Sequence, residues 1–137
     1  MKQVFADTSY WVALVVPDDR WNRRALELSR GLGQVQVVTT QEVLTEFLNY
    51  VSSHSRIVRE RVSTWVADRT TGGECLVIEQ SGASFNAGLQ LYRARLDKEY
   101  SLTDCISMAA MRARNITDVL THDHHFEQEG FRALLRG

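Results

Sequence analysis

Acidic residues stand near both ends of the 137-residue chain, at positions that suit shared chemistry. Asp7 directly follows a strand-like run at 4–6, and Asp123 comes just after a second such run at 119–120. In a parallel α/β sheet, ligands bind beyond the carboxyl ends of the strands, so both carboxylates are expected at one edge. Carboxylates held together repel one another and raise each other's pKa values, and a divalent cation relieves that repulsion. The positions therefore indicate a metal site.

Two further acids fall within predicted helices and extend this candidate cluster. Glu46 borders the apolar stripe of a helix expected over 41–51, at the boundary between core and cleft. Asp104 opens an almost wholly apolar helix expected over 102–114, a pattern typical of a buried helix. A carboxylate beside a buried surface is costly unless it is paired, hydrogen-bonded or bound to a metal. Carboxylate oxygens suit hard ions, so the expected metal is Mg²⁺ or Mn²⁺.

Each acid also has a structural interpretation that the sequence leaves open. Asp7 and Asp123 suit the N-cap of a following helix. Asp104 fits a capping box with Ser101, and Glu46 fits a half-exposed surface position. No single position decides between these roles. The functional interpretation is favoured because the four positions converge on one edge of a parallel sheet.

The elements that must position these acids alternate between short strands and longer helices. Strands are expected at 4–6, 35–38, 76–78 and 119–120, with a fifth at 132–135, and helices at 9–16, 21–32, 41–51, 56–67, 84–96 and 102–114. The helix over 41–51 is expected to begin with a capping box of Thr39 and Glu42. This alternation indicates βαβ units and a parallel sheet covered by helices on both faces.

Three histidines, His122, His124 and His125, crowd the segment around Asp123. A zinc site would need paired histidines at helical spacing or a cysteine partner, and neither is evident. We expect a solvated, partly aromatic loop here, from which one histidine could contact a phosphate.

Composition is typical of a globular protein, with 44% apolar and 24% charged residues, and its length predicts a single domain over residues 1–137. No signal-like start or membrane-length apolar run is visible, so we expect a cytoplasmic protein without membrane contact. The net charge of −1 does not indicate a nucleic-acid binder. All basic residues except Lys2 and Lys98 are arginines, which suit phosphate, although genomic GC content also enriches arginine.

The chain resembles the PIN-domain family, and within it the VapC-type toxins of bacterial toxin–antitoxin pairs. The resembling segments are Phe5–Tyr10 (FADTSY), Val43–Phe47 (VLTEF), Ser101–Ser107 (SLTDCIS) and Val119–Phe126 (VLTHDHHF). Each motif alone is weak, whereas the ordered set is specific and covers nearly the whole chain.

The resemblance implies a three-layer α/β/α sandwich with a five-stranded, mainly parallel sheet. It implies a metal-dependent endoribonuclease that hydrolyses RNA phosphodiester bonds, with one or two Mg²⁺ or Mn²⁺ ions. The implied catalytic and metal-binding residues are Asp7, Glu46, Asp104 and Asp123, with Thr8, Thr103 and Asp97 as supporting positions. It also implies a homodimer and a cognate antitoxin that covers the acidic groove.

Two other functions remain as alternatives. An aspartyl-nucleophile phosphohydrolase would fit Asp7, but such enzymes usually place a second aspartate where this chain has Ser9. A non-catalytic PIN-like module that binds RNA or protein would be favoured by the loss of an acid, and all four acids are present. A stable oligomer without metal binding would support that second alternative.

Overall fold

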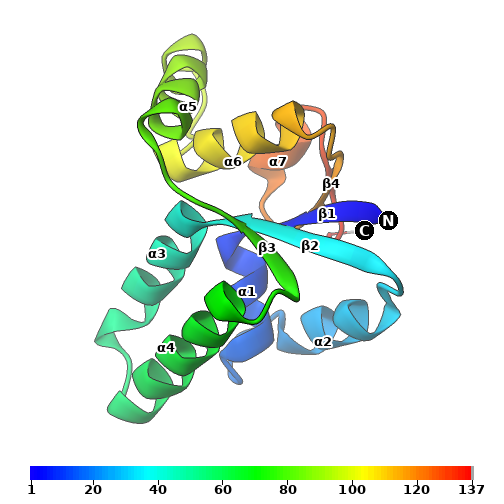
Figure 1. The fold of residues 1–137 in the computed structure, drawn as a ribbon, viewed down its shortest axis with the longest axis vertical. Coiled ribbons are helices and arrows are strands. Elements are labelled where there is room, and N and C mark those ends of the chain that lie inside the picture. The colour runs from blue at the N-terminus through cyan, green and yellow to red at the C-terminus, as the bar shows by residue number, and fades with distance from the viewer. Residues whose placement is uncertain (137) are drawn as a thin grey trace.

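A five-stranded, all-parallel sheet forms the centre of the fold in this computed structural model, which describes residues 1–136 (Figure 1). The strands are β1 (Lys2–Ala6), β2 (Val35–Thr40), β3 (Cys75–Ile78), β4 (Asp118–Leu120) and β5 (Arg132–Ala133), in the spatial order β3-β2-β1-β4-β5. Residue 137, the last of the predicted domain, lies outside the described range. The predicted α/β class with a five-stranded sheet is confirmed, and each neighbouring pair of strands is parallel.

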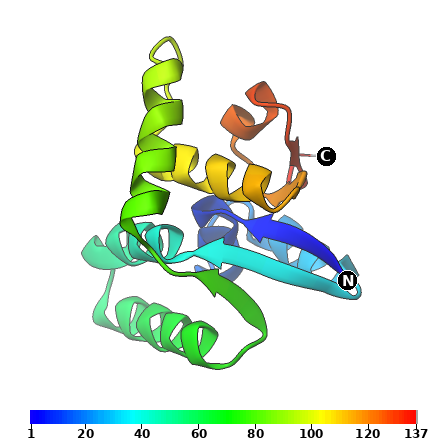
Figure 2. The ribbon, with the colours of Figure 1, turned by 45° about the horizontal axis from the view of Figure 1, so that its top comes forward.

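Helices cover both faces of this sheet. They are α1 (Thr8–Val15), α2 (Asn22–Gly31), α3 (Gln41–Tyr50), α4 (Arg56–Thr71), α5 (Gly82–Ala94), α6 (Leu102–Ala113) and α7 (His124–Gln128), with a 3₁₀ turn at Val51–Ser53. Helices α5, α6 and α7 lie on one side of the sheet, and α1, α2 and α4 lie on the other, as two views show (Figures 1 and 2). Across residues 1–136, no helix has both the length and the apolar character needed to span a membrane.

Apolar side chains from both layers meet on the central strands. Phe5 of β1 and Leu120 of β4 are fully buried, as expected for strands covered on both faces. Helix α6 buries Met108 and Met111 completely, which agrees with its apolar sequence. A Cβ on Gly88 of α5 would lie 3.0 Å from the backbone nitrogen of Ile106, so glycine allows α5 to approach α6 closely. This contact helps to place the N-terminal turn of α6, which carries Asp104.

Two local predictions are wrong, and each has a physical reason. The N-cap of α3 is Thr40, whose Oγ1 accepts from the Val43 backbone, while the Thr39 hydroxyl donates to the carbonyl of Ala6. The strand extends two residues further than predicted, so the cap shifts by one residue. The segment expected as a histidine-rich loop contains α7, which Asp123 caps. The fully buried ring of Phe126 anchors this helix to the core.

Glu129 joins three segments beside α7 through its nearly buried carboxylate, which is 5% exposed. Its oxygens accept from Arg95 at 2.8 Å, Arg112 at 2.8 Å and Tyr100 at 2.9 Å. Burial alone would raise the pKa of Glu129, but the hydrogen bonds from Arg112, Arg95 and Tyr100 outweigh it and lower the pKa to about 2. The Tyr100 ring in turn meets the edge of the His125 ring, with centroids 5.4 Å apart.

Replacing Glu129 by Gln is expected to destabilise the protein by about 2 kcal/mol at neutral pH, because charge-assisted hydrogen bonds weaken. A lowered carboxylate pKa stabilises the fold above its unfolded value near 4.5, and this contribution is lost as the pH falls from there towards 2. Urea denaturation at pH 6 and pH 3 measures both effects. Glu127→Gln is the control. Glu127 pairs with Arg136, and because both side chains are about half exposed, loss of this ion pair should change the free energy of unfolding little. Equal losses in the two variants would contradict the prediction.

Candidate active site

The four acids singled out from the sequence line one cavity of about 740 Å³. Asp7 follows β1 and Asp123 comes three residues after the end of β4, and these neighbouring strands pair Ala6 with Leu120 at their carboxyl ends. Glu46 enters from α3 and Asp104 from the first turn of α6. The structure therefore brings residues from two strand ends and two helices to one edge of the sheet.

Asp7 is the most deeply placed of these carboxylates, with 3% of its surface exposed. Its Oδ2 accepts from Thr121 at 2.9 Å, whereas its buried Oδ1 has no hydrogen-bond partner within residues 1–136. Asp7 occupies the N-cap position of α1, but within the described chain its side chain makes no capping bond. Burial, and then the negative charge of Asp104, raise the pKa of Asp7 to about 7. Helix capping thus does not explain this carboxylate.

Asp104 combines a structural role with a place in the cluster. Its Oδ2 accepts from the Ser101 backbone at 3.1 Å, which completes the capping box predicted for α6. Burial raises the pKa of Asp104, and the negative charges of Asp123 and Glu46 raise it further. The backbone hydrogen bond from Ser101 and the nearby His125 act in the opposite direction. Capping uses one carboxylate oxygen, while burial and the two neighbouring acids oppose ionisation of the group.

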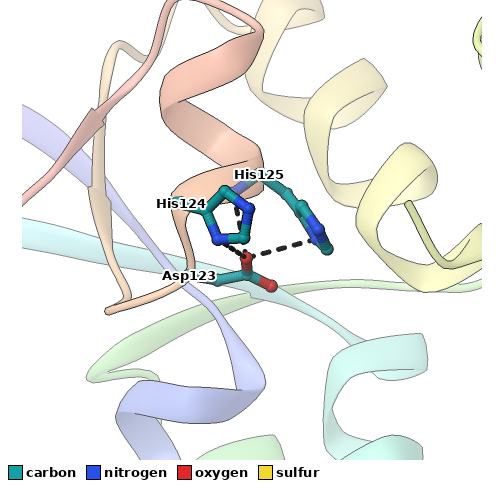
Figure 3. Close-up of side chains that lie close together, drawn as sticks. All are labelled: Asp123, His124 and His125. Carbon is teal, nitrogen blue, oxygen red and sulfur yellow. Dashed lines mark hydrogen bonds and ion pairs between the residues drawn. The ribbon is translucent and has the colours of Figure 1, made fainter. Parts of the chain in front are cut away.

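Asp123 and two histidines face one another at the start of α7 (Figure 3). Asp123 Oδ1 accepts from the backbone of His125 at 2.9 Å and lies 3.2 Å from His125 Nδ1 and 3.8 Å from His124 Nδ1. His125 Nδ1 is also 3.6 Å from Asp104 Oδ2, so this ring lies between two acids of the cluster. One possible ligand atom from each of Asp123, His124 and His125 falls within 4.8 Å of the others.

Thr121 and Ser9 belong to the site, although the sequence did not single them out. The fully buried Thr121 hydroxyl donates to Asp7 Oδ2, accepts from the Asp123 backbone at 3.0 Å and lies 2.8 Å from Ser9 Oγ. This network fixes the ends of β1 and β4 relative to each other. Thr121 directly follows β4, as Asp7 directly follows β1, and that shared position is the signal that could have identified it.

The three supporting positions differ in where the structure places them. Thr8 lines the cavity, and its buried Oγ1 has no hydrogen-bond partner among residues 1–136. Thr103 lines a neighbouring groove that shares Glu46 with the cavity. Asp97 lies outside the cavity wall, with a side chain 72% exposed and 3.7 Å from Lys98, and Glu99 lines the wall instead.

The cavity wall is strongly acidic. Asp19 and Glu99 join the four clustered acids there, while Arg20 is the one arginine or lysine in this wall within the described residues. Six carboxylates lie in this wall, and one of their oxygens, Oδ1 of Asp7, has no hydrogen-bond partner among the described residues. Such a set of oxygen ligands suits a divalent cation. Such a cation would also offset the charge that otherwise repels a phosphate.

Comparison with known proteins gives a consistent result. A family model described as the PIN domain matches residues 4–131. VapC20 from Mycobacterium tuberculosis, a sarcin–ricin loop cleaving toxin, has a similar fold with a TM-score of 0.83 and 24% identity, over 93% of this chain and 95% of that one. VapBC2 from Rickettsia felis, solved with a promoter DNA fragment, has a TM-score of 0.62 and 16% sequence identity over 96% of each chain. FitAcB from Neisseria gonorrhoeae has a TM-score of 0.60 and 16% sequence identity over 95% of this chain and 94% of that one. No curated protein matches the sequence.

Proposed function

The chain belongs to the PIN-domain family, and on this basis we propose that it is a metal-dependent endoribonuclease of the toxin type. One observation carries the proposal beyond family membership. Asp7 is buried with an unpartnered oxygen, within the described residues, in a cavity that also collects Glu46, Asp104 and Asp123. Burying an unpaired carboxylate costs free energy of folding, so it is expected where the carboxylate has a function. Carboxylates with shifted pKa values in a cleft are typical of active sites.

The proposed metal ligands are Asp7, Glu46, Asp104 and Asp123, and the proposed ion is Mg²⁺ or Mn²⁺. When bound, this cation lowers the pKa of water and neutralises charge that develops on the phosphate during hydrolysis. The chain's own residues set the geometry. Thr121 orients Asp7 through its hydroxyl, and the Ser101 backbone holds one oxygen of Asp104. Arg20, on the cavity wall, is placed to bind a flanking phosphate of the substrate.

RNA is the proposed substrate, and the cytoplasm is the proposed place of action because such substrates occur there. A cognate antitoxin is the proposed protein partner. Similar folds occur in a Klebsiella pneumoniae toxin–antitoxin complex, with a TM-score of 0.59 and 15% identity over 88% of this chain and 87% of that one, and in VapBC2. A homodimer is proposed from the family resemblance alone, and size-exclusion chromatography with light scattering tests it.

The test of the proposed function is cleavage of a panel of structured RNAs, including transfer RNA, with and without Mg²⁺ or Mn²⁺. Cleavage that requires the metal and stops with a chelator is the expected result. Metal binding without cleavage would indicate a substrate outside the panel, and the panel is then extended to ribosomal RNA. Absence of both metal binding and cleavage would favour the non-catalytic module.

The histidines give a separate prediction about which metal is bound. His124→Ala is expected to change Mn²⁺ affinity and cleavage by less than about threefold, since carboxylates suit Mg²⁺ and Mn²⁺ whereas imidazole favours Zn²⁺ and other later transition metals. The His124 side chain is 59% exposed, so the substitution should not affect folding. Isothermal titration with Mn²⁺ and with Zn²⁺ measures the preference. A site that prefers Zn²⁺ and loses it in His124→Ala would instead assign the ion to Asp123, His124 and His125.

A further inference from the structure

Two aromatic rings stack on each other at the side of the acidic cavity. Trp21 lies at the N-cap of α2, and His122 lies between β4 and α7, directly before Asp123. Their rings are nearly parallel, with an interplanar angle of 9° and centroids 4.9 Å apart. The backbone nitrogen of Trp21 donates to Asp19 at 3.0 Å, and that of His122 donates to Ser9 at 3.3 Å. The pair is therefore held at a fixed place beside the acids.

This aromatic pair is accessible from the cavity. Trp21 and His122 are both half-buried, and both line the cavity with the four clustered acids. The exposed side chain of Arg20 places its guanidinium carbon 5.5 Å from the centroid of the Trp21 ring. Among the described residues the Arg20 side chain makes no hydrogen bond or ion pair, so a planar, π-rich ligand can take its place on the indole without breaking one.

The charge of the cavity makes such an uncharged contact important. Nucleic-acid affinity usually comes from lysines and arginines that neutralise phosphates. Six carboxylates line this cavity, and Arg20 is their single arginine or lysine counterpart in the described part of the chain. A bound divalent cation offsets only part of that excess. Stacking of a base on an aromatic ring is insensitive to the net charge and is worth roughly 5- to 150-fold in affinity.

We propose that Trp21 and His122 form a binding site for one unpaired nucleobase, next to the phosphodiester that the acids would cleave. This inference rests on the proposed function, because it names a part of the substrate bound by the same cavity. Stacking requires a base that is free of its helix, so the substrate would present a single-stranded or looped nucleotide here. This stacking platform, formed by Trp21 and His122, tolerates different bases, since every base has a π face.

The test compares adenosine 5′-monophosphate with ribose 5-phosphate, which carries the same phosphate without a base. Both are titrated in Mg²⁺ while tryptophan fluorescence and binding heat are followed. The other two tryptophans, Trp11 and Trp65, contact each other and lie outside the cavity wall, so quenching reports Trp21. We expect adenosine 5′-monophosphate to quench the fluorescence and to bind at least about fivefold more tightly than ribose 5-phosphate.

Variants connect the effect to the platform. Trp21→Leu is expected to abolish both the quench and the preference for the base, whereas Trp21→Phe keeps a ring and most of the preference. Tyr92→Leu, which removes a 40% exposed aromatic on α5 outside the cavity wall, should change neither. Thermal melting followed by circular dichroism identifies a misfolded variant. If Trp21→Leu misfolds, folded Trp21→Phe is compared with the unmodified protein by binding heat, and loss of the base preference in this variant, which keeps a ring, would contradict the platform.

The outcomes separate this inference from the proposed function. Equal binding of the two probes, or an unchanged preference in Trp21→Leu, would overturn the platform even if RNA is cleaved. A polypeptide side chain as the natural occupant would give that same equal binding. A base preference that depends on Trp21, with neither metal binding nor RNA cleavage, would support the platform and contradict the ribonuclease. If the platform and the ribonuclease are both correct, Trp21→Leu raises the KM for RNA by about the factor that separates the affinities of the two probes, and leaves kcat nearly unchanged.

Discussion

Asp104→Asn is expected to reduce metal-dependent RNA cleavage by at least about a hundredfold while the protein remains folded. Loss of a residue that merely supports a metal ligand typically costs 10- to 100-fold, so loss of a proposed ligand itself should cost at least the upper figure. The fold should survive because the asparagine side-chain oxygen can still accept from the Ser101 backbone, as the carboxylate does. The substitution thus removes the charge and keeps the cap.

Initial rates in Mn²⁺ and the thermal midpoint of unfolding are measured together for Asp104→Asn. Asp97→Asn is the comparison, since the structure places that exposed aspartate outside the cavity wall, and its activity should stay within about twofold of the unmodified protein. Near-normal cleavage by folded Asp104→Asn would remove Asp104 from the site. Loss of cleavage in Asp97→Asn would show that the site extends beyond the cavity wall.

Asp7→Asn is expected to stabilise the metal-free protein, by roughly 2 kcal/mol at pH 8, while it abolishes metal-dependent cleavage. The pKa of Asp7 is raised to about 7 by burial and by Asp104. A folded state with a raised carboxyl pKa binds its proton more tightly than the unfolded chain does. Stability therefore falls as the pH rises from about 4 to about 7 and stays low above that range. The asparagine amide does not titrate in this pH range, so this part of the pH dependence should disappear.

Urea denaturation with a chelator at pH 5 and pH 8 tests this expectation. The gain from Asp7→Asn should be larger at pH 8, and added Mg²⁺ should stabilise the unmodified protein but not the variant. A purely structural Asp7, acting as a helix cap, predicts the opposite sign, a loss of about 1 kcal/mol on substitution. A variant less stable than the unmodified protein at both pH values would therefore favour the structural role.

The sequence by itself determined the class of fold and the positions of the four acids. Short apolar runs ending at 6, 38, 78 and 120 lie in strands β1 to β4, and the period of the intervening segments is helical. The carboxyl ends of parallel strands share one edge, so Asp7 and Asp123 were expected at the same edge of the sheet. That β1 and β4 are neighbours in that sheet was decided by the tertiary structure. Local rules were sufficient where the signal lies in periodicity, and also at Ser101, whose capping box with Asp104 is present.

Only the tertiary structure decided which neighbouring polar groups complete the site. The bond from Thr121 to Asp7 joins residues 114 positions apart, and no periodicity encodes which way a hydroxyl turns. The sequence offered Asp123 as an N-cap, but a helix as short as α7 has too few residues for a periodic pattern to favour it over a loop, and its stability depends on the burial of Phe126. The stack of Trp21 on His122, and the placement of Glu99 rather than Asp97 in the cavity wall, likewise follow from packing between distant segments. Strand ends fix where a site lies, whereas side-chain contacts across the fold decide what surrounds it.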